Sequence, residues 1–198
     1  MLENLRPLLT KILEPFAKRM NINPNILTLI SPFIALAAAY SFSKHLLILA
    51  TIFILLSGFL DVADGAVARY HNRASKFGAF FDSTMDRISD AILIIGIIFG
   101  GYCNWLLGIL LIHSAIMVSY VKACSESQGI ECNTGIAERA VRLIIIMIGS
   151  IISAICNNPI IFTYFLIILM ILSYITVAQR FYHSYKQLKI EGNNKNGN

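Results

Sequence analysis

Four aspartates at helical spacing are the residues in this sequence best suited to do chemistry. Asp61 and Asp64 are spaced i, i+3, and Asp82 and Asp86 are spaced i, i+4. On two helices each pair would share one face, so a turn between the helices could bring all four carboxylates together. Carboxylates this close cannot all stay ionised without a cation between them. Because carboxylate oxygens are hard ligands, the pattern predicts a Mg²⁺ or Mn²⁺ site.

Small and basic residues around these acids favour a phosphate-bearing ligand. Three small residues would let a bulky group approach the backbone: Gly65, Ala68 and Gly78. Arg69 is placed to bind phosphate. The alternative is that the acids only form ion pairs at helix ends, but two spaced pairs around a basic turn are more than packing requires. For Asp90, which lies three residues after Arg87, a surface ion pair is the favoured interpretation.

Long apolar runs must position these acids, and they indicate a membrane protein. The 198 residues are 57% apolar and 14% charged, with a mean hydropathy of +0.69, which excludes soluble, secreted and disordered classes. We predict an all-α polytopic membrane protein with six transmembrane helices, at residues 26–42, 46–68, 77–101, 105–123, 137–155 and 160–182. An N-terminal amphipathic surface helix would occupy residues 1–20, and the spans would form one domain over residues 21–186. Residues 187–198 are polar and are predicted to form a disordered tail.

The placement of charge predicts how the chain lies in the membrane. The net charge is +5, and Lys and Arg gather at the helix ends on the side shared by the two termini, so they orient the chain and do not indicate a nucleic-acid partner. The positive-inside rule therefore places both termini and the acidic site in the cytoplasm, and we expect the cell (plasma) membrane. The four cysteines lack C-x-x-C spacing, so we expect free thiols.

Read together, the acids and small residues resemble the signature of the CDP-alcohol phosphotransferase family: Asp61-x2-Asp64-Gly65-x2-Ala68-Arg69-x8-Gly78-x3-Asp82-x3-Asp86. The resemblance covers nearly the whole chain. It implies an enzyme that moves a lipid-phosphoryl group from a CDP-lipid to an alcohol and releases CMP, working as a metal-dependent homodimer. It further implies that the four aspartates hold the metal and that Asp86 is the general base for the acceptor hydroxyl.

The same resemblance implies a binding site for the CDP-lipid. The residues that would contact it lie at the start of the first span and around the acids: Asn25, Ile26, Leu27, Thr28, Gly65, Ala68, Arg69, Ser75 and Gly78. The lipid could be CDP-diacylglycerol or CDP-archaeol, and the sequence leaves both open.

Four cations in the second half of the chain are candidates for the acceptor-phosphate site: Lys122, Arg139, Arg142 and Arg180. They could bind a phosphate-bearing alcohol, although positive-inside placement alone would also put cations at these helix ends. The segments around them resemble the phosphatidylinositol phosphate synthase branch of the family and its archaeal counterpart, the archaetidylinositol phosphate synthases. That resemblance implies inositol 1-phosphate as the acceptor. Relatives in this branch often have a basic residue and a proline where this chain has Cys124 and Ala140.

Two other functions are alternatives at this point. A glycerol 3-phosphate acceptor, as in phosphatidylglycerophosphate synthases, would suit the same cations. A cation-coupled transporter would also use carboxylates within the membrane. Such a transporter predicts ionisable groups on both sides of the membrane, whereas the loops expected outside have almost none.

Overall fold

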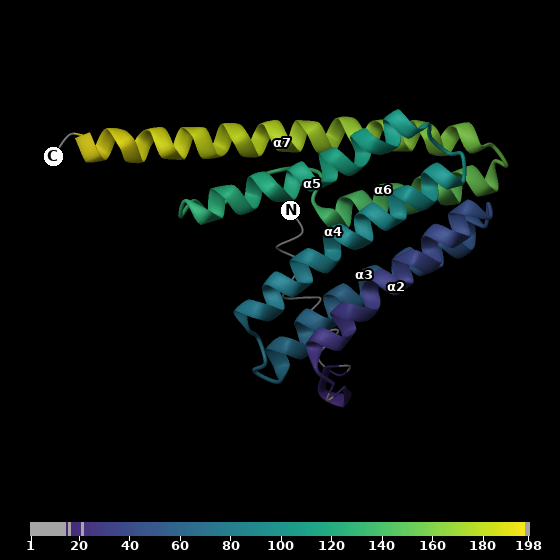
Figure 1. Ribbon diagram of the computed structural model, residues 1–198, viewed down its shortest axis with the longest axis horizontal. Helices are drawn as coiled ribbons and strands as arrows, with labels where there is room; N and C mark the ends of the chain where they lie inside the picture. Colours follow the sequence, from purple (N-terminus) through teal and green to yellow (C-terminus); the bar gives the residue numbers. More distant parts are fainter. Residues whose placement is uncertain (1–14, 16, 21, 197–198) are drawn as a thin grey trace. The chain divides into compact units, whose positions relative to one another are not determined.

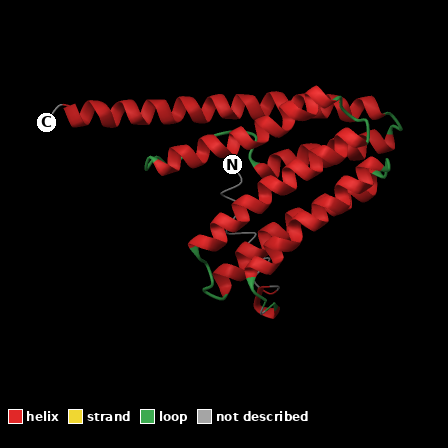
Figure 2. Cartoon of the chain, viewed as in Figure 1, coloured by secondary structure: helices red, strands yellow, loops and turns green. Residues whose placement is uncertain are grey.

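The computed structural model describes residue 15 and residues 17–20 and 22–196, and all regular structure within them is helical (Figure 2). The helices are α2 (Pro24–Ser43), α3 (Leu47–Tyr70), α4 (Lys76–Phe99), α5 (Trp105–Ser127), α6 (Arg139–Ile155) and α7 (Pro159–Asn196) (Figure 1). The prediction of an all-α fold is confirmed. The chain forms two compact units, Met1–Gly96 and Ile97–Asn198.

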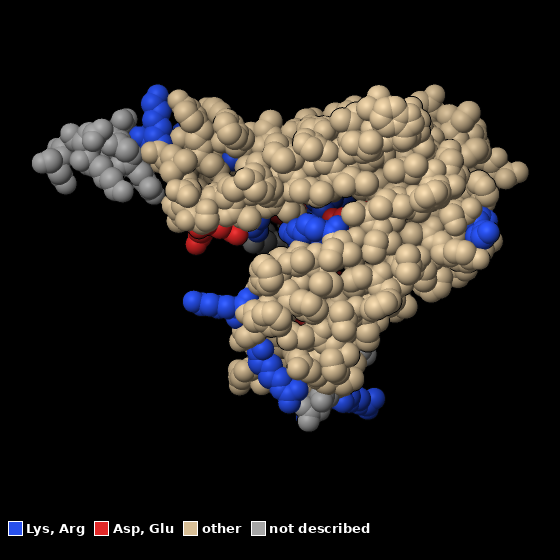
Figure 3. Space-filling model, viewed as in Figure 1, with Lys and Arg blue, Asp and Glu red and all other residues tan. Residues whose placement is uncertain are grey.

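Length and composition identify four of the described helices as candidate membrane spans: Pro24–Ser43, Leu47–Tyr70, Trp105–Ser127 and Pro159–Ile190. The two remaining predicted spans are also helices, but α4 carries five charged residues and α6 has 17 residues. Charged side chains occupy only small parts of the surface in Figure 3. The apolar helices therefore support an integral membrane protein, while the count of six spans stays a prediction.

In the first unit, α2 and α3 pack side by side (Figure 1). The Asn23 side chain accepts a hydrogen bond from the Asn25 N–H at 3.1 Å, and Pro24 follows as the first helical residue, so the break predicted there is the start of α2. Deeper in the pair, the hydroxyls of Ser31 and Ser57 share a buried hydrogen bond of 3.0 Å. Hydroxyl pairs of this kind hold apolar helices together where water is absent.

The turn between α3 and α4 brings the ends of these two helices together. The Arg73 N–H donates to the Ala68 carbonyl at 2.8 Å, and Asn72 adopts a positive φ of 52°, which asparagine tolerates better than most residues. Ser75 Oγ then accepts from the Gly78 N–H at 3.0 Å, as an N-cap residue does. Both aspartate pairs of the signature flank this turn.

In the second unit, α7 packs against both α5 and α6. Gly149 of α6 makes the close approach possible, because a Cβ there would lie 2.7 Å from Phe165 Cβ of α7. At the start of α7, Thr163 Oγ1 donates to the Tyr102 carbonyl at 2.6 Å. Phe162 beside it is fully buried and packs edge-to-face on the Tyr102 ring.

Two predictions concern the ends of the chain. Most of the amphipathic helix predicted over residues 1–20 lies outside the described residues, so it stays a prediction. At the other end, α7 continues to Asn196, whereas we predicted a disordered tail from residue 187. Side chains 187–190 are exposed, so this described part of the extension is not packed against the rest of the chain. The prediction rested on polar composition, which does not forbid a helix that simply continues from an apolar one.

The close contact at Gly149 yields a stability prediction. Gly149→Ala should destabilise the protein by about 1–3 kcal/mol, because the new methyl group would overlap the near end of the Phe165 side chain. Thermal unfolding of the purified protein in detergent measures this. Ile148→Ala is the matched control, since Ile148 is the preceding residue and is 44% exposed. Equal loss of stability in both variants would contradict the close packing of α6 on α7.

Candidate active site

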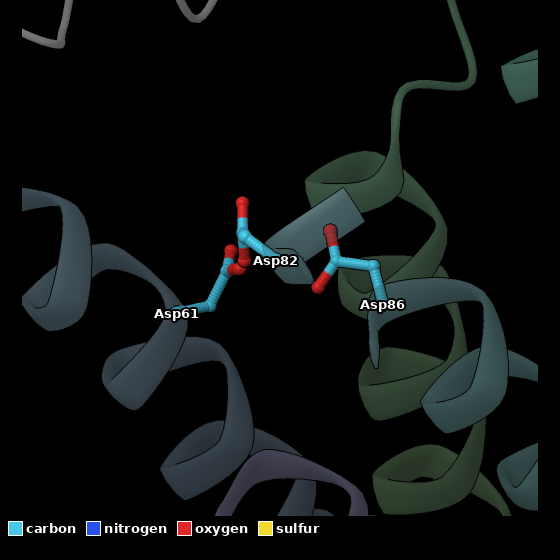
Figure 4. Close-up of side chains that lie close together, drawn as sticks. All are labelled: Asp61, Asp82 and Asp86. Atoms are coloured by element: carbon cyan, nitrogen blue, oxygen red, sulfur yellow. The ribbon is translucent and has the colours of Figure 1, made fainter. Parts of the chain in front are cut away.

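Three of the four signature aspartates form one cluster. Oxygens of Asp61 from α3 and of Asp82 and Asp86 from α4 all lie within 4.8 Å of one another. Figure 4 shows the three carboxylates turned toward a common region. Each side chain is partly buried, so solvent screens their repulsion only in part. The set consists of hard oxygen donors and fits a divalent cation with open coordination positions.

Asp64 is placed differently from the other three. It is only 5% exposed, and one of its carboxylate oxygens accepts a short hydrogen bond from Thr28 Oγ1 of α2. The predicted set of four metal ligands is therefore divided in this structure into a cluster of three and one carboxylate held by a hydroxyl. Position i+3 shares a face with position i but is rotated from it by about 60°, so Asp64 lies on the part of that face that is nearer to Thr28 of α2.

A cavity of about 220 Å³ lies beside the carboxylates in the first unit. Most residues predicted to contact the CDP-lipid line it: Asn25, Thr28, Gly65, Ala68, Arg69, Ser75 and Gly78. Asp64 and Asp82 line it too, so the cavity and the carboxylate cluster share Asp82. Three segments that are separate in the sequence thus meet here: the start of α2, the end of α3, and the turn that leads into α4.

Two predicted contact residues do not line the cavity. Ile26 is 49% exposed, and Leu27 is buried in a small core with Ala17, Ala66 and Val67. The assignment of Ile26 and Leu27 to the CDP-lipid site came from reading residues 25–28 as one segment. In a helix, however, residues i and i+3 share a face and the two residues between them do not. Of residues 25–28, Asn25 and Thr28 line the cavity and the two residues between them do not.

Two glycines keep the cavity open. A Cβ on Gly65 would lie 3.3 Å from Arg69 Nη1, and a Cβ on Gly78 would lie 3.2 Å from Ser75 Oγ and 3.4 Å from Asn25 Oδ1. Side chains at either position would crowd the polar groups that line the site. The small residues of the signature are thus explained by space for these groups and for a ligand.

Sequence reasoning missed one cation at this site. Arg73 lines the cavity together with Arg69, and its Nη1 donates to the Ile22 carbonyl at 3.4 Å. Arg73 follows Arg69 by four positions, a spacing that would put both on one face of a continuous helix. However, α3 ends at Tyr70, so helical spacing does not explain why both residues line the cavity. The turn, not a helix face, places the second guanidinium at the cavity.

The carboxylate cluster also has a neighbouring cation. Arg87 Nη1 lies 3.4 Å from Asp86 Oδ2 and donates to the Ser83 carbonyl at 2.7 Å. The sequence predicted an ion pair between Arg87 and Asp90, which stays a prediction, and the structure adds this contact between Arg87 and Asp86. An adjacent residue can pair this way because the long arginine side chain folds back along the helix surface.

The candidate acceptor cations lie in the second unit, and two of them are buried and hydrogen-bonded to the backbone. Arg142 is 5% exposed and donates to the Ala137 carbonyl at 3.2 Å, while Arg180 is 4% exposed. Arg180 donates from Nε to the Thr134 carbonyl at 2.8 Å and from Nη1 to the Val118 carbonyl at 2.7 Å. Cations that served only to orient the chain would not need burial or specific partners.

The other two cations are less enclosed. Arg139 is the first residue of α6 and is partly buried. Lys122 Nζ lies 3.6 Å from Glu126 Oε1 on the same helix, with both side chains well exposed. The structure therefore brings Arg142 and Arg180 to the same α5–α6 loop, and it leaves Lys122 in a surface ion pair.

The sequence is similar to a known protein family and to two enzymes of that family. The family model described as CDP-alcohol phosphatidyltransferase matches residues 21–182. The chain is 43% identical over 189 residues to the archaetidylinositol phosphate synthase of Methanothermobacter thermautotrophicus, covering 96% of each chain. It is 40% identical over 194 residues to the archaetidylinositol phosphate synthase of Pyrococcus horikoshii, covering 96% of this chain and all of the other.

Solved structures agree with the sequence comparison. The fold resembles Mycobacterium tuberculosis phosphatidylinositol phosphate synthase with CDP-DAG bound, at a TM-score of 0.79 and 26% identity, covering 88% of this chain and 94% of the other. It also resembles that enzyme in complex with manganese and citrate, at a TM-score of 0.77 and 26% identity, covering 89% and 88%. With the carboxylate cluster, the adjoining cavity and the match over residues 21–182, the chain belongs to the CDP-alcohol phosphatidyltransferase family.

Proposed function

We propose that this protein transfers the lipid-phosphoryl group of a CDP-lipid to inositol 1-phosphate, releasing CMP and forming a phosphatidyl- or archaetidylinositol phosphate. The observation that carries the proposal is the juxtaposition of three clustered carboxylates with a cavity lined by Arg69, Arg73 and small residues. The names of the relatives support the same reaction, since both archaeal relatives are archaetidylinositol phosphate synthases and the structural relative binds CDP-DAG.

The carboxylate cluster would hold Mg²⁺ or Mn²⁺ through Asp61, Asp82 and Asp86. A cation bound there supplies positive charge for the pyrophosphate of the substrate and for the leaving CMP. Asp64 faces the cavity and would complete the acidic site from the α2 side, with its orientation fixed by Thr28. Manganese in a structural relative is consistent with this donor set.

The cavity residues have separate tasks in this proposal. Arg69 and Arg73 would pair with phosphate oxygens, because a guanidinium matches their geometry with two donors at once. The Asn25 amide and the Ser75 hydroxyl are neutral groups suited to hydrogen bonds with the nucleotide. Asp86 would accept the proton of the attacking acceptor hydroxyl. Its 14% side-chain exposure leaves it reachable by a substrate while limiting access of water.

The acceptor phosphate would be held by Arg139, Arg142 and Arg180, with Lys122 at the edge of the site. Burial of Arg142 and Arg180 supports this role, since buried guanidinium groups bind anions more strongly than exposed ones. A glycerol 3-phosphate acceptor would use the same cations. We favour inositol 1-phosphate because the archaeal relatives are named for that product and align over almost the whole chain.

We also propose how the protein lies in the cell. Helices α2 to α7 would make six spans preceded by an amphipathic surface helix in residues 1–20, and the protein would be a homodimer. Both termini and the active site would face the cytoplasm at the cell membrane, since the positive-inside rule places the basic turns there.

Metal dependence is the first expected property. Removal of divalent cations with EDTA should abolish CMP release, and Mg²⁺ or Mn²⁺ should restore it, because clustered carboxylates need a counter-charge. Mn²⁺ should also raise the thermal unfolding temperature of the parent protein, and Asp61→Asn should lose that stabilisation. Full turnover in excess EDTA, or equal stabilisation of Asp61→Asn, would contradict the site.

Asp86 and Asp90 should differ in their effect on catalysis. Asp86→Asn removes the proposed base and one of the three clustered carboxylates, so kcat should fall by about 10²- to 10⁴-fold, with a much smaller rise in the KM for CDP-lipid. Asp90→Asn, one turn along the same helix, should stay within about twofold of the parent. Steady-state CMP release measures both. If Asp90→Asn proved as damaging as Asp86→Asn, the assignment of the base would be wrong.

The acceptor site predicts an effect on one substrate only. Arg142→Gln removes a charge-assisted contact, so the KM for inositol 1-phosphate should rise about tenfold or more while that for CDP-lipid stays constant. Lys186→Gln is the control, because Lys186 is an exposed cation on α7 away from these contacts. The parent protein should prefer inositol 1-phosphate to free inositol and glycerol 3-phosphate. A preference for glycerol 3-phosphate would keep the phosphate site and overturn the inositol assignment.

A further inference from the structure

The loop between α5 and α6, residues 128–138, is attached to one face of α7 along most of its length. Thr176, Arg180 and His183 of α7 follow one another at helical spacing, and each contacts a backbone group of this loop. The loop has no regular structure of its own, so its peptide groups need partners from elsewhere. Side chains of α7 supply several of them.

Thr176 makes the most concentrated of these attachments. Its Oγ1 accepts hydrogen bonds from the Ala137 N–H at 2.9 Å and from the Ile136 N–H at 3.2 Å. The same hydroxyl donates to the Leu172 carbonyl of its own helix at 2.9 Å, which orients its lone pairs toward the loop. Thr176 is completely buried, so it cannot touch a substrate from solvent. It can act only through the residues that it holds.

Ala137 connects this attachment to the acceptor site. Its carbonyl accepts from Arg142 Nη1 at 3.2 Å, and Ala137 itself is completely buried. Ala137 thus has two roles: its N–H is held by the Thr176 hydroxyl, and its carbonyl orients the Arg142 guanidinium. A shift of Ala137 would move the partner of Arg142 and the first turn of α6, where Arg139 also lies.

Gly135 allows the loop to come this close. Its φ is +121°, a conformation that L side chains rarely adopt, and a Cβ there would lie 2.5 Å from Thr176 Cγ2. A Cβ would also lie 3.2 Å from Arg180 Nε. The glycine is therefore needed both for its backbone conformation and for contact with the Thr176 side chain.

We propose that Thr176 is a positioning residue for the acceptor, which fixes Ala137 and thereby holds the Arg142 guanidinium in the geometry that binds the acceptor phosphate. This proposal rests on the proposed function, because it assigns Thr176 a task in acceptor binding. Threonine is well suited to it, since one hydroxyl accepts twice and donates once while the methyl group packs against Gly135.

The test compares Thr176→Val with Thr176→Ser. Valine keeps the shape but removes the hydroxyl, so the KM for inositol 1-phosphate should rise about tenfold with the KM for CDP-lipid unchanged. Serine keeps the hydroxyl and should stay within about twofold of the parent in both KM values. A KM for inositol 1-phosphate that is unchanged in Thr176→Val would overturn the proposal.

Thr163→Val is the matched control for a loss of stability alone. Thr163 also lies on α7 and donates one hydrogen bond to a loop carbonyl, that of Tyr102, but it has no link to Arg142. Its substitution should lower the unfolding temperature and leave both KM values unchanged. An equal rise in the KM for inositol 1-phosphate in Thr163→Val would mean that Thr176 acts through general stability, which would overturn the positioning role.

Gly135→Ala is a second route to the same contact and serves if Thr176→Val does not fold. The added methyl group would push the loop away from Thr176, so the KM for inositol 1-phosphate should rise selectively here too. Unchanged KM values in a folded Gly135→Ala would contradict the proposal. The acceptor assignment is tested separately with the parent protein. If the parent does not use inositol 1-phosphate, the proposed function is wrong; if it does, the variants test the role of Thr176 alone.

Discussion

A charged side chain at the end of an apolar helix is stable only when a counter-charge or a set of hydrogen-bonding partners lies beside it, and both units depend on this constraint. In the first unit, Asp64 accepts a hydrogen bond from Thr28, while the other three carboxylates face one another at a distance that suits a cation. In the second unit, Arg142 and Arg180 donate to backbone carbonyls. The clustered acids therefore suit a cation, and the buried arginines bind to backbone carbonyls of the protein.

The clustered carboxylates and the backbone-bonded arginines differ in what they can bind. Carboxylates that share a cation can bind and polarise phosphate groups, since the cation keeps coordination positions for the substrate. A guanidinium has five donors, and the two bonds to Thr134 and Val118 use only part of that capacity in Arg180. These hydrogen bonds to backbone carbonyls thus hold the plane of the guanidinium in place without using all of its donors. Such preorganisation lowers the cost of binding an anion.

The loop before α6 and the arginines stabilise each other. A loop without regular structure has peptide groups that need partners, and leaving them without one is costly where the loop is buried, as at Cys132 and Ala137. Thr176 accepts hydrogen bonds from two N–H groups of the loop, and Arg180 donates to one carbonyl of the loop. Side chains of α7 therefore provide partners for both donors and acceptors of the loop backbone. The bare backbone at Gly135 is what permits this approach. The same rule explains Gly65 and Gly78 in the first unit, where the space is left for polar side chains and a ligand.

The sequence by itself determined the chemistry and the helices. Apolar runs of membrane-spanning length give the all-α fold, and the two aspartate pairs, Arg69 and the small residues define the signature, because both features depend on residue type and on spacing along one helix. Most of the residues that the family resemblance predicted to contact a CDP-lipid line one cavity.

Only the tertiary structure decided which of these side chains meet. Spacing along one helix could not show that Asp64 accepts a hydrogen bond from Thr28 or that Arg73 reaches the cavity through a turn. Nor could it reveal Thr176, whose partners lie about forty residues earlier in the chain. Hydrogen bonds between distant segments depend on how helices rotate and approach one another, and that is set by packing against neighbours, which a local pattern does not encode.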